Sequence, residues 1–200
     1  MSNKAFSRFH SFAFIAILLL AISVAVQAGD FTNLPSIKNF GRINDSYYRG
    51  AQPQNQDYAN LAAFGIRTVI NLTSDDAETN EKMMVENAGM KYHQIPMNTH
   101  VTPTTAQLTE FLGIVNDPAS QPVYVHCVGG KHRTGVMTAV YRMISGWNAD
   151  QAFKEMKQYD FGPSFLHSEF KNFVFRYYNE LSQAKTAPVQ TVLTAKTAGS

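Results

Sequence analysis

The sequence is poor in cysteine, tryptophan and charge. Its 200 residues include one cysteine, Cys127, and one tryptophan, and charged residues make up only 16%. A single thiol excludes an internal disulfide, and it excludes a structural zinc site built from several cysteines. Cys127 is therefore either a buried packing residue or a reactive group. Hydrophobic residues make up 44% and 14 residues are phenylalanine, which is the composition of a chain that folds around a core.

A long apolar run occurs only near the start of the chain. Lys4 and Arg8 precede an uncharged stretch at residues 12–26, and residues 26–28 (Val-Gln-Ala) offer small side chains at the usual spacing of a cleavage site. The run has about 15 residues, fewer than the roughly 20 that a membrane-spanning helix needs. We therefore expect residues 1–28 to form a secretory signal peptide, which makes the mature protein periplasmic or secreted, and periplasmic in a bacterium.

Cleavage also changes the charge of the chain. The only charged residues of the segment are Lys4 and Arg8, so their loss lowers the formal net charge from +2 to zero. A chain with a net charge of zero has no excess of positive charge with which to bind a nucleic acid. No later segment is long and apolar enough to span a membrane. We expect a monomer with no nucleic-acid partner and no stable membrane insertion after cleavage.

Strand and helix patterns alternate along the rest of the chain. Apolar and β-branched stretches predict strands at 46–49, 67–72, 92–95 and 123–126. Periodicity and capping residues predict helices at 53–65, 74–88, 102–115, 136–144, 148–156 and 166–181, the fifth with a capping box of Asn148 and Gln151. The alternation is typical of an α/β fold with a central, mostly parallel sheet of four to five strands covered by helices on both faces. We expect this domain over residues 29–181 and a disordered tail at 182–200.

The segment 125–135 (Val-His-Cys-Val-Gly-Gly-Lys-His-Arg-Thr-Gly) ends a predicted strand and begins a predicted helix. Successive backbone N–H groups of such a loop can converge on one anion, and the positive end of the helix dipole adds to the attraction. Gly129 and Gly130 allow the backbone angles that the turn requires, and Arg133 can bind two phosphate oxygens through its planar guanidinium. The same positive surroundings favour the nucleophilic thiolate form of Cys127. The segment therefore predicts a phosphate site that also activates a thiol.

This spacing resembles the signature His-Cys-x-x-Gly-x-x-Arg-(Ser/Thr)-Gly of the protein tyrosine phosphatase superfamily, which the segment matches at six positions. Within the superfamily the chain resembles the small dual-specificity type. Residues 48–53 (Tyr-Arg-Gly-Ala-Gln-Pro) and 65–72 (Gly-Ile-Arg-Thr-Val-Ile-Asn-Leu) are similar to the opening of atypical dual-specificity phosphatases from bacteria, plants and fungi. The resemblance extends over residues 40–180 and implies the cysteine phosphatase fold.

The resemblance also implies an activity: hydrolysis of phosphate monoesters through a phosphocysteine intermediate. Cys127 would attack phosphorus, Arg133 would hold the phosphoryl oxygens and Thr134 would assist breakdown of the intermediate. His126 would orient the loop and tune the thiol. The substrate-binding residues implied are those of the loop itself: Val128, Gly129, Gly130, Lys131, His132 and Arg133. The partner would be a phosphorylated protein or a small phosphorylated molecule. In a protein the substrate would be phosphotyrosine, with phosphoserine and phosphothreonine as further candidates. No cofactor and no metal would be needed.

Three alternative functions stay open. Residues 130–135 (Gly-Lys-His-Arg-Thr-Gly) also resemble the plant and fungal branch that cleaves inositol pyrophosphates, where Lys131 would meet a second phosphate, although a lysine on a loop rim is ordinarily solvated. A non-catalytic phosphate-binding module is the second alternative. A rhodanese-like sulfurtransferase, which also uses a loop cysteine before a helix, is the third and least favoured. Arg49, beside a strand and a turn, is expected to pair with a carboxylate or with carbonyl groups at the edge of the core.

One feature of the family is missing from this sequence. Relatives carry an aspartate general acid on a loop before the cysteine, but residues 95–101 (Ile-Pro-Met-Asn-Thr-His-Val) contain no carboxylate. His100 is the only ionisable side chain there; its imidazolium can protonate a leaving oxygen, unless it is an ordinary surface histidine. Asp75 and Asp76 follow another strand and also suit the capping of the helix predicted at 74–88. The general acid is therefore His100, Asp75, Asp76 or none of them.

Overall fold

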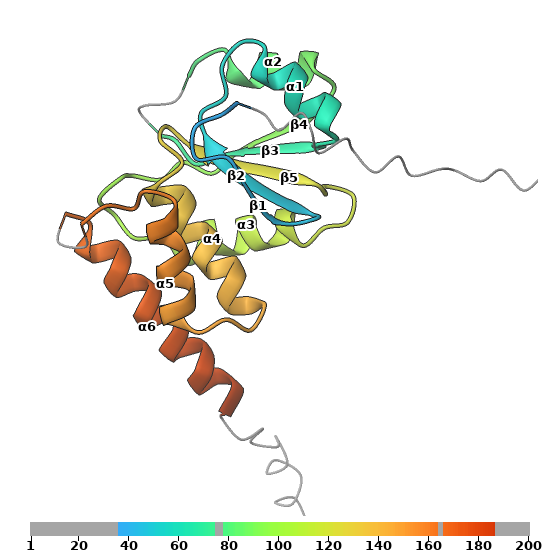
Figure 1. The fold of residues 1–200 in the computed structure, drawn as a ribbon. Helices are drawn as coiled ribbons and strands as arrows, with labels where there is room; N and C mark the ends of the chain where they lie inside the picture. Colours follow the sequence, from blue (N-terminus) through green and yellow to red (C-terminus); the bar gives the residue numbers. More distant parts are fainter. Residues whose placement is uncertain (1–35, 75–77, 164–165, 187–200) are drawn as a thin grey trace, which may run out of the picture.

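The computed structural model describes residues 36–74, 78–163 and 166–186, which form a twisted sheet with helices on both sides (Figure 1). The strands of the sheet are β1 (Gly41–Asn44), β2 (Tyr47–Ala51), β3 (Thr68–Asn71), β4 (Lys91–Gln94) and β5 (Val123–Cys127). Their order across the sheet is β1-β2-β5-β3-β4. β1 pairs antiparallel with β2, and all other neighbours are parallel. The predicted α/β fold with a mostly parallel sheet is confirmed.

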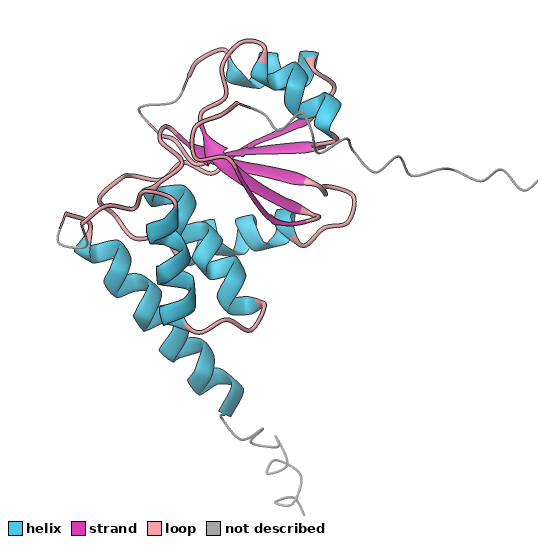
Figure 2. Cartoon of the chain, viewed as in Figure 1, coloured by secondary structure: helices cyan, strands magenta, loops and turns pink. Residues whose placement is uncertain are grey.

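Helices cover both faces of this sheet (Figure 2). On one face lie α1 (Asp57–Phe64) and α2 (Glu81–Asn87). On the other face lie α3 (Thr105–Val115) and α4 (His132–Ile144), with α5 (Ala149–Gln158) and α6 (Ser168–Thr186) packed against α4. Among the described residues, no helix combines the length and the hydropathy that crossing a membrane requires.

The central strand β5 is buried at all of its positions and divides its side chains between two cores. Val125 and Cys127 belong to the core on the side of α3 and α4, whereas Tyr124 belongs to the core under α1 and α2. Because side chains of a strand alternate between faces, His126 lies on the same side as Tyr124. The residue before the cysteine and the cysteine itself therefore belong to opposite faces of the sheet.

Three helix starts and one strand differ from the sequence-based predictions. α1 begins at Asp57 rather than at Pro53, because Asn55 has a φ of +42°, which interrupts a right-handed helix. β1 was not predicted, because its sequence Gly-Arg-Ile-Asn has one apolar side chain and the strand pairs on one side only. α2 begins at Glu81 after Asn80, so Ser74 does not cap it, and Asp75 lies outside the described residues. α3 is capped by the side chain of Thr104 rather than by Thr102, because Thr104 forms a capping box with Gln107.

The predicted capping box of α5 is confirmed by two reciprocal hydrogen bonds. The N–H of Gln151 donates to Asn148 Oδ1 at 2.8 Å, and the N–H of Asn148 donates to Gln151 Oε1 at 2.9 Å. At the other end of the domain, α6 runs on to Thr186, beyond residue 181, because Gln, Ala and Lys are good helix formers. The predicted signal peptide and residues 187–200 of the predicted tail lie outside the described residues.

Candidate active site

The segment singled out in the sequence connects the middle strand of the sheet to the central helix. Cys127 is the last residue of β5 and is 3% exposed, and Arg133 lies in the first turn of α4 and is 4% exposed. Residues 127–133, here called the phosphate loop, therefore lie at the carboxyl end of the parallel strands and at a helix N-terminus. Open α/β sheets bind ligands at this edge, and a helix N-terminus attracts anions.

Three successive carbonyl groups of the phosphate loop are held from outside by β2, by a residue before β1 and by the residue after β2. The hydrogen bonds are Gln52 N–H to Val128 O at 3.2 Å, Asn39 Nδ2 to Gly129 O at 2.8 Å, and Arg49 Nη2 to Gly130 O. In a planar trans peptide the N–H points away from the carbonyl. The following N–H groups are therefore turned toward the inside of the loop, where they can surround one anion.

Gly130 is the point at which the loop comes closest to the sheet. Its φ is +64°, and a Cβ at this position would lie 2.4 Å from the carbonyl carbon of Gly50 and 2.6 Å from the nitrogen of Ala51. Only glycine accepts both the angle and the close approach. The sequence-based expectation that this glycine permits the turn is consistent with both measurements.

Arg49 lies fully buried and is one of the groups that shape the phosphate loop. Besides its bond to Gly130, its guanidinium lies over the ring of Tyr159 at 4.0 Å. Its Nε and Nη1 have no hydrogen-bond partner within the described residues. Burial lowers the pKa of Arg49, and the nearby Cys127 works in the opposite direction. Because a guanidinium stays protonated in proteins, Arg49 adds positive charge beside the thiol, and the expectation that it binds a carbonyl is confirmed.

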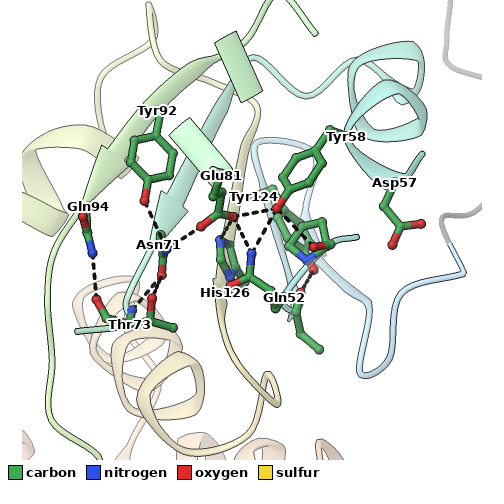
Figure 3. Close-up of polar contacts among 12 residues, drawn as sticks. Gln52, Asp57, Tyr58, Asn71, Thr73, Glu81, Tyr92, Gln94, Tyr124 and His126 are labelled. Atoms are coloured by element: carbon green, nitrogen blue, oxygen red, sulfur yellow. Dashed lines mark hydrogen bonds and ion pairs between the residues drawn. The ribbon is translucent and has the colours of Figure 1, made fainter. Parts of the chain in front are cut away.

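On the other face of the sheet, His126 meets a buried carboxylate. His126 Nε2 lies 2.8 Å from Glu81 Oε1, and neither side chain is exposed. The same carboxylate accepts hydrogen bonds from three other elements: from Gln52 Nε2 at 2.7 Å, from the Tyr58 hydroxyl at 3.2 Å and from Asn71 Nδ2. Figure 3 shows Glu81 between these groups. One side chain thus joins α2 to α1, β3, β5 and the residue that follows β2.

Glu81 was not predicted from the sequence, although one signal was present. Glu81 and Val85 are the two buried residues of α2, and they are four positions apart, which places them on one face of a helix. A carboxylate on an apolar helix face is rarely buried without partners. The position of Glu81 could have been recognised from the sequence as part of a buried polar cluster, but the residues that contact it could not.

The remaining loop residues differ in their surroundings. The Thr134 hydroxyl is buried and has no hydrogen-bond partner in the part of the chain that the structure describes, so it is available to a reacting group. Lys131 Nζ lies 3.5 Å from Asp160 Oδ2, and Val128 is 50% exposed. Arg133 donates from Nη1 to the Met97 carbonyl at 3.2 Å, which ties the arginine to the loop that carries His100.

The structure places His100 at the rim of the phosphate loop. Its ring stacks on that of His167 at 5.8 Å, and His167 packs at 3.6 Å against His132 of the loop. Partial burial lowers the pKa of His132, and His167 adds to this effect. His132 Nε2 contacts the Phe161 carbonyl at 3.0 Å. The candidate acids Asp75 and Asp76 lie outside the described residues, so the general acid stays a prediction.

The sequence as a whole matches a known family. A model described as the tyrosine phosphatase family covers residues 35–196. The chain belongs to this family. Over 125 residues it is 28% identical to the probable tyrosine-protein phosphatase DG1060 of Dictyostelium discoideum, an alignment that covers 60% of this chain and 75% of that protein.

Two further similarities extend the comparison. The chain is 26% identical to the inositol diphosphatase SIW14 of Saccharomyces cerevisiae over 129 residues, which is 62% of this chain but only 46% of the yeast protein. The crystal structure of a variant of Pseudomonas aeruginosa TpbA in complex with phosphotyrosine has a TM-score of 0.62 at 26% identity, covering 80% of this chain and 97% of that one. The family and the fold implied by the sequence resemblance are thereby confirmed.

Glu81→Gln tests the buried carboxylate. The new amide would bring an NH₂ group against groups that already donate, and His126 would lose its charged partner. We expect the free energy of unfolding to fall by about 1–3 kcal/mol and hydrolysis of an aryl phosphate to slow, because His126 directly precedes the thiol. Urea unfolding and initial rates measure the two effects. Glu86→Gln, at an exposed position of the same helix, is the matched control; equal behaviour of the two variants would contradict the role of Glu81.

Proposed function

We propose that the chain is a cysteine-dependent phosphatase that hydrolyses phosphate monoesters through a phosphocysteine, with phosphotyrosine as its main substrate class. The observation that carries the proposal is the outward binding of three successive carbonyls beside a buried cysteine. This arrangement directs N–H groups at a phosphate in front of Cys127. Arg133, at the end of the same loop, supplies the two-pronged contact to its oxygens.

The reaction proceeds in two balanced steps. In the first, the Cys127 thiolate attacks phosphorus, the S–P bond forms and the P–O bond to the leaving group breaks. The loop N–H groups and Arg133 stabilise the charge on the equatorial oxygens, and the leaving oxygen takes a proton from an acid or from water. In the second, water attacks phosphorus and the S–P bond breaks; the protons of the water stay on the released phosphate, and sulfur leaves as the restored thiolate. Thr134 can donate its hydroxyl hydrogen to the departing sulfur.

The charges around the phosphate loop favour a monoester over a densely phosphorylated substrate. Lys131 is already paired with Asp160. Beside exposed Val128 there is an open pocket of about 490 Å³, whose lining includes Lys38 but also the carboxylates of Asp57 and Glu78. Two carboxylates near one ammonium group repel additional phosphates. A neutral aromatic ring attached to a single phosphate meets no such repulsion.

A second candidate function is hydrolysis of inositol pyrophosphates. It is favoured by the likeness to SIW14 and by the segment 130–135, and the carboxylates near the pocket speak against it. Sulfur transfer is disfavoured by the family match and by the Arg-Thr pair that ends the loop. A panel of phosphotyrosine peptides, phosphoserine peptides, inositol phosphates and thiosulfate, assayed with one preparation, ranks these functions directly.

Cys127→Ser and Arg133→Lys test the mechanism. The serine hydroxyl is hardly ionised near neutral pH, so Cys127→Ser should abolish turnover of para-nitrophenyl phosphate while vanadate still binds. Arg133→Lys should lose most activity, because a point charge does not replace a planar two-pronged contact. Phosphate release and calorimetric titration with vanadate measure both effects. Arg176→Lys, an exposed position on α6, should behave as wild type, and activity retained by either active-site variant would contradict the mechanism.

His100→Ala tests the proposed general acid. A general acid contributes about 10²–10⁴-fold when the leaving group is poor, and little when the leaving oxygen is already stable as an anion. The variant should therefore slow phosphotyrosine and phosphoserine peptides far more than para-nitrophenyl phosphate. Initial rates with the three substrates give the ratio, and His93→Ala on β4 is the control. Equal slowing of all three, or of none, would remove His100 from the mechanism.

We further propose that the protein is exported and acts as a periplasmic monomer after loss of residues 1–28. The support is the charge pattern and the short apolar run of that segment. Protein recovered from the periplasm of an expressing bacterium should have the intact mass of a chain that begins at Gly29, and should elute as a monomer in size-exclusion chromatography. A full-length mass, or retention in the cytoplasm, would contradict export.

A further inference from the structure

Metal-binding side chains from two distant segments meet at the rim of the phosphate loop. His100 comes from the loop after β4, whereas His167 directly precedes α6 and Glu169 lies in its first turn. Glu169 Oε1 lies 4.0 Å from His100 Nδ1 and 3.8 Å from His167 Nδ1. One potential ligand atom from each residue lies within 4.8 Å of the other two. The tertiary fold therefore gathers two imidazoles and a carboxylate around one point.

Two of these three atoms are buried without a hydrogen bond. His167 Nδ1 and Glu169 Oε1 are shielded from solvent, and neither has a hydrogen-bond partner in the described parts of the chain. An unsatisfied buried polar atom is unfavourable for folding, so it calls for an explanation such as a bound ion. Their separation is too long for a hydrogen bond, but it approaches the distance of about 3.3 Å between two ligands of one tetrahedral zinc ion.

The two sides of the cluster differ in how firmly they are held. The His167 ring packs between His132 at 3.6 Å and Phe170 at 6.3 Å, so its orientation is fixed by neighbours that do not use its Nδ1. The His100 side chain is 73% exposed and belongs to a loop. His100 can therefore move toward an ion held by His167 and Glu169 without disturbing the core.

We propose that His100, His167 and Glu169 form a binding site for one divalent transition-metal ion of the zinc type, with water as the fourth ligand. Two imidazole nitrogens and one carboxylate oxygen are a common ligand set for Zn²⁺ in a site with an open position. Calcium and magnesium prefer oxygen ligands and fit this set poorly. The ion is not a reactant of the phosphatase reaction, because phosphate binding and nucleophile are both provided by the phosphate loop.

Occupation of the site regulates turnover, a consequence that rests on the proposed role of His100. Zn²⁺ takes up the lone pair of His100 Nδ1, so the ring cannot form the imidazolium that donates a proton to the leaving oxygen. The ion also fixes the loop that contacts Arg133 through the Met97 carbonyl. Zinc therefore inhibits hydrolysis of esters with poor leaving groups and has little effect on para-nitrophenyl phosphate.

The site is tested by metal titration of tag-free protein in the Cys127→Ser background, which removes the competing thiol. Zn²⁺ binding is followed by competition with a chromophoric chelator, and Co²⁺ binding by its visible absorption, which reports a tetrahedral site. We expect one ion per chain. His100→Ala, which alters an exposed side chain, and Glu169→Gln, which keeps the shape of its side chain, should each weaken binding about 10-fold or more, at least the loss that outer-shell changes cause. His93→Ala is the matched control and should bind as the background protein does.

The outcomes separate the metal site from the phosphatase proposal. The proposed site is overturned if Zn²⁺ shows no saturable one-to-one binding. It is also overturned if the background protein and its His100→Ala and Glu169→Gln variants bind Zn²⁺ with equal affinity. Both conclusions hold whatever substrate the enzyme hydrolyses. Weaker binding in both variants supports it even if turnover proves unaffected by zinc. The regulatory consequence is tested with protein that retains Cys127. It is supported if zinc inhibits phosphotyrosine hydrolysis and the inhibition disappears in Glu169→Gln. Equal inhibition in that variant overturns it.

Discussion

The phosphate loop lies directly against the backbone of β2, with no side chain between them, and the geometry of the site depends on this contact. Gly130 leaves no room for a Cβ above Gly50, and a Cβ on Gly50 would itself lie 2.2 Å from the Tyr124 hydroxyl. That hydroxyl donates to the Ala51 carbonyl at 2.7 Å. The close approach brings the loop carbonyls within reach of donors near β2, so the sheet fixes the direction of the loop N–H groups before any anion arrives. Such preorganisation is the main source of electrostatic stabilisation in enzymes.

The alternation of side chains along β5 separates the charges that surround this loop. Cys127 faces the side on which Arg49 lies, whereas His126 faces Glu81 on the opposite side. The Glu81 carboxylate is satisfied by several donors, so its negative charge is locally compensated. Arg49 instead keeps two buried nitrogen atoms without hydrogen bonds among the described residues, which costs free energy. In return, Arg49 makes the electrostatic potential beside Cys127 more positive, which favours a thiolate and a bound phosphate in the proposed reaction.

The parts of the site that could be predicted are those that are contiguous in the sequence. The phosphate loop occupies one short segment whose glycines, cysteine and arginine have physical uses that follow from their spacing, and the parallel sheet follows from the alternation of strands and helices. The supports of the loop are not contiguous, since Asn39 and Arg49 contact it across 90 and 81 residues. For Arg49 the sequence indicated the kind of partner, but it did not indicate that the carbonyl of Gly130 is the one that accepts the hydrogen bond. Glu81 was missed altogether, because its function depends on four elements that meet only in the folded chain.

The histidine at position 100 bears on more than the proposed donation of a proton. An aspartate in place of His100 would leave His167 and Glu169 without a second imidazole. Its carboxylate would also lie near the carboxylate of Glu169, and two like charges repel each other. An imidazole can donate a proton or bind a transition metal, so the two roles that we propose for His100 exclude each other at one atom. Because Arg133 donates to the Met97 carbonyl of this same loop, the position of the loop also affects the residue that holds the phosphate. If His100 is the proton donor, as we propose, then proton donation, loop position and phosphate binding are linked at one entrance to the site.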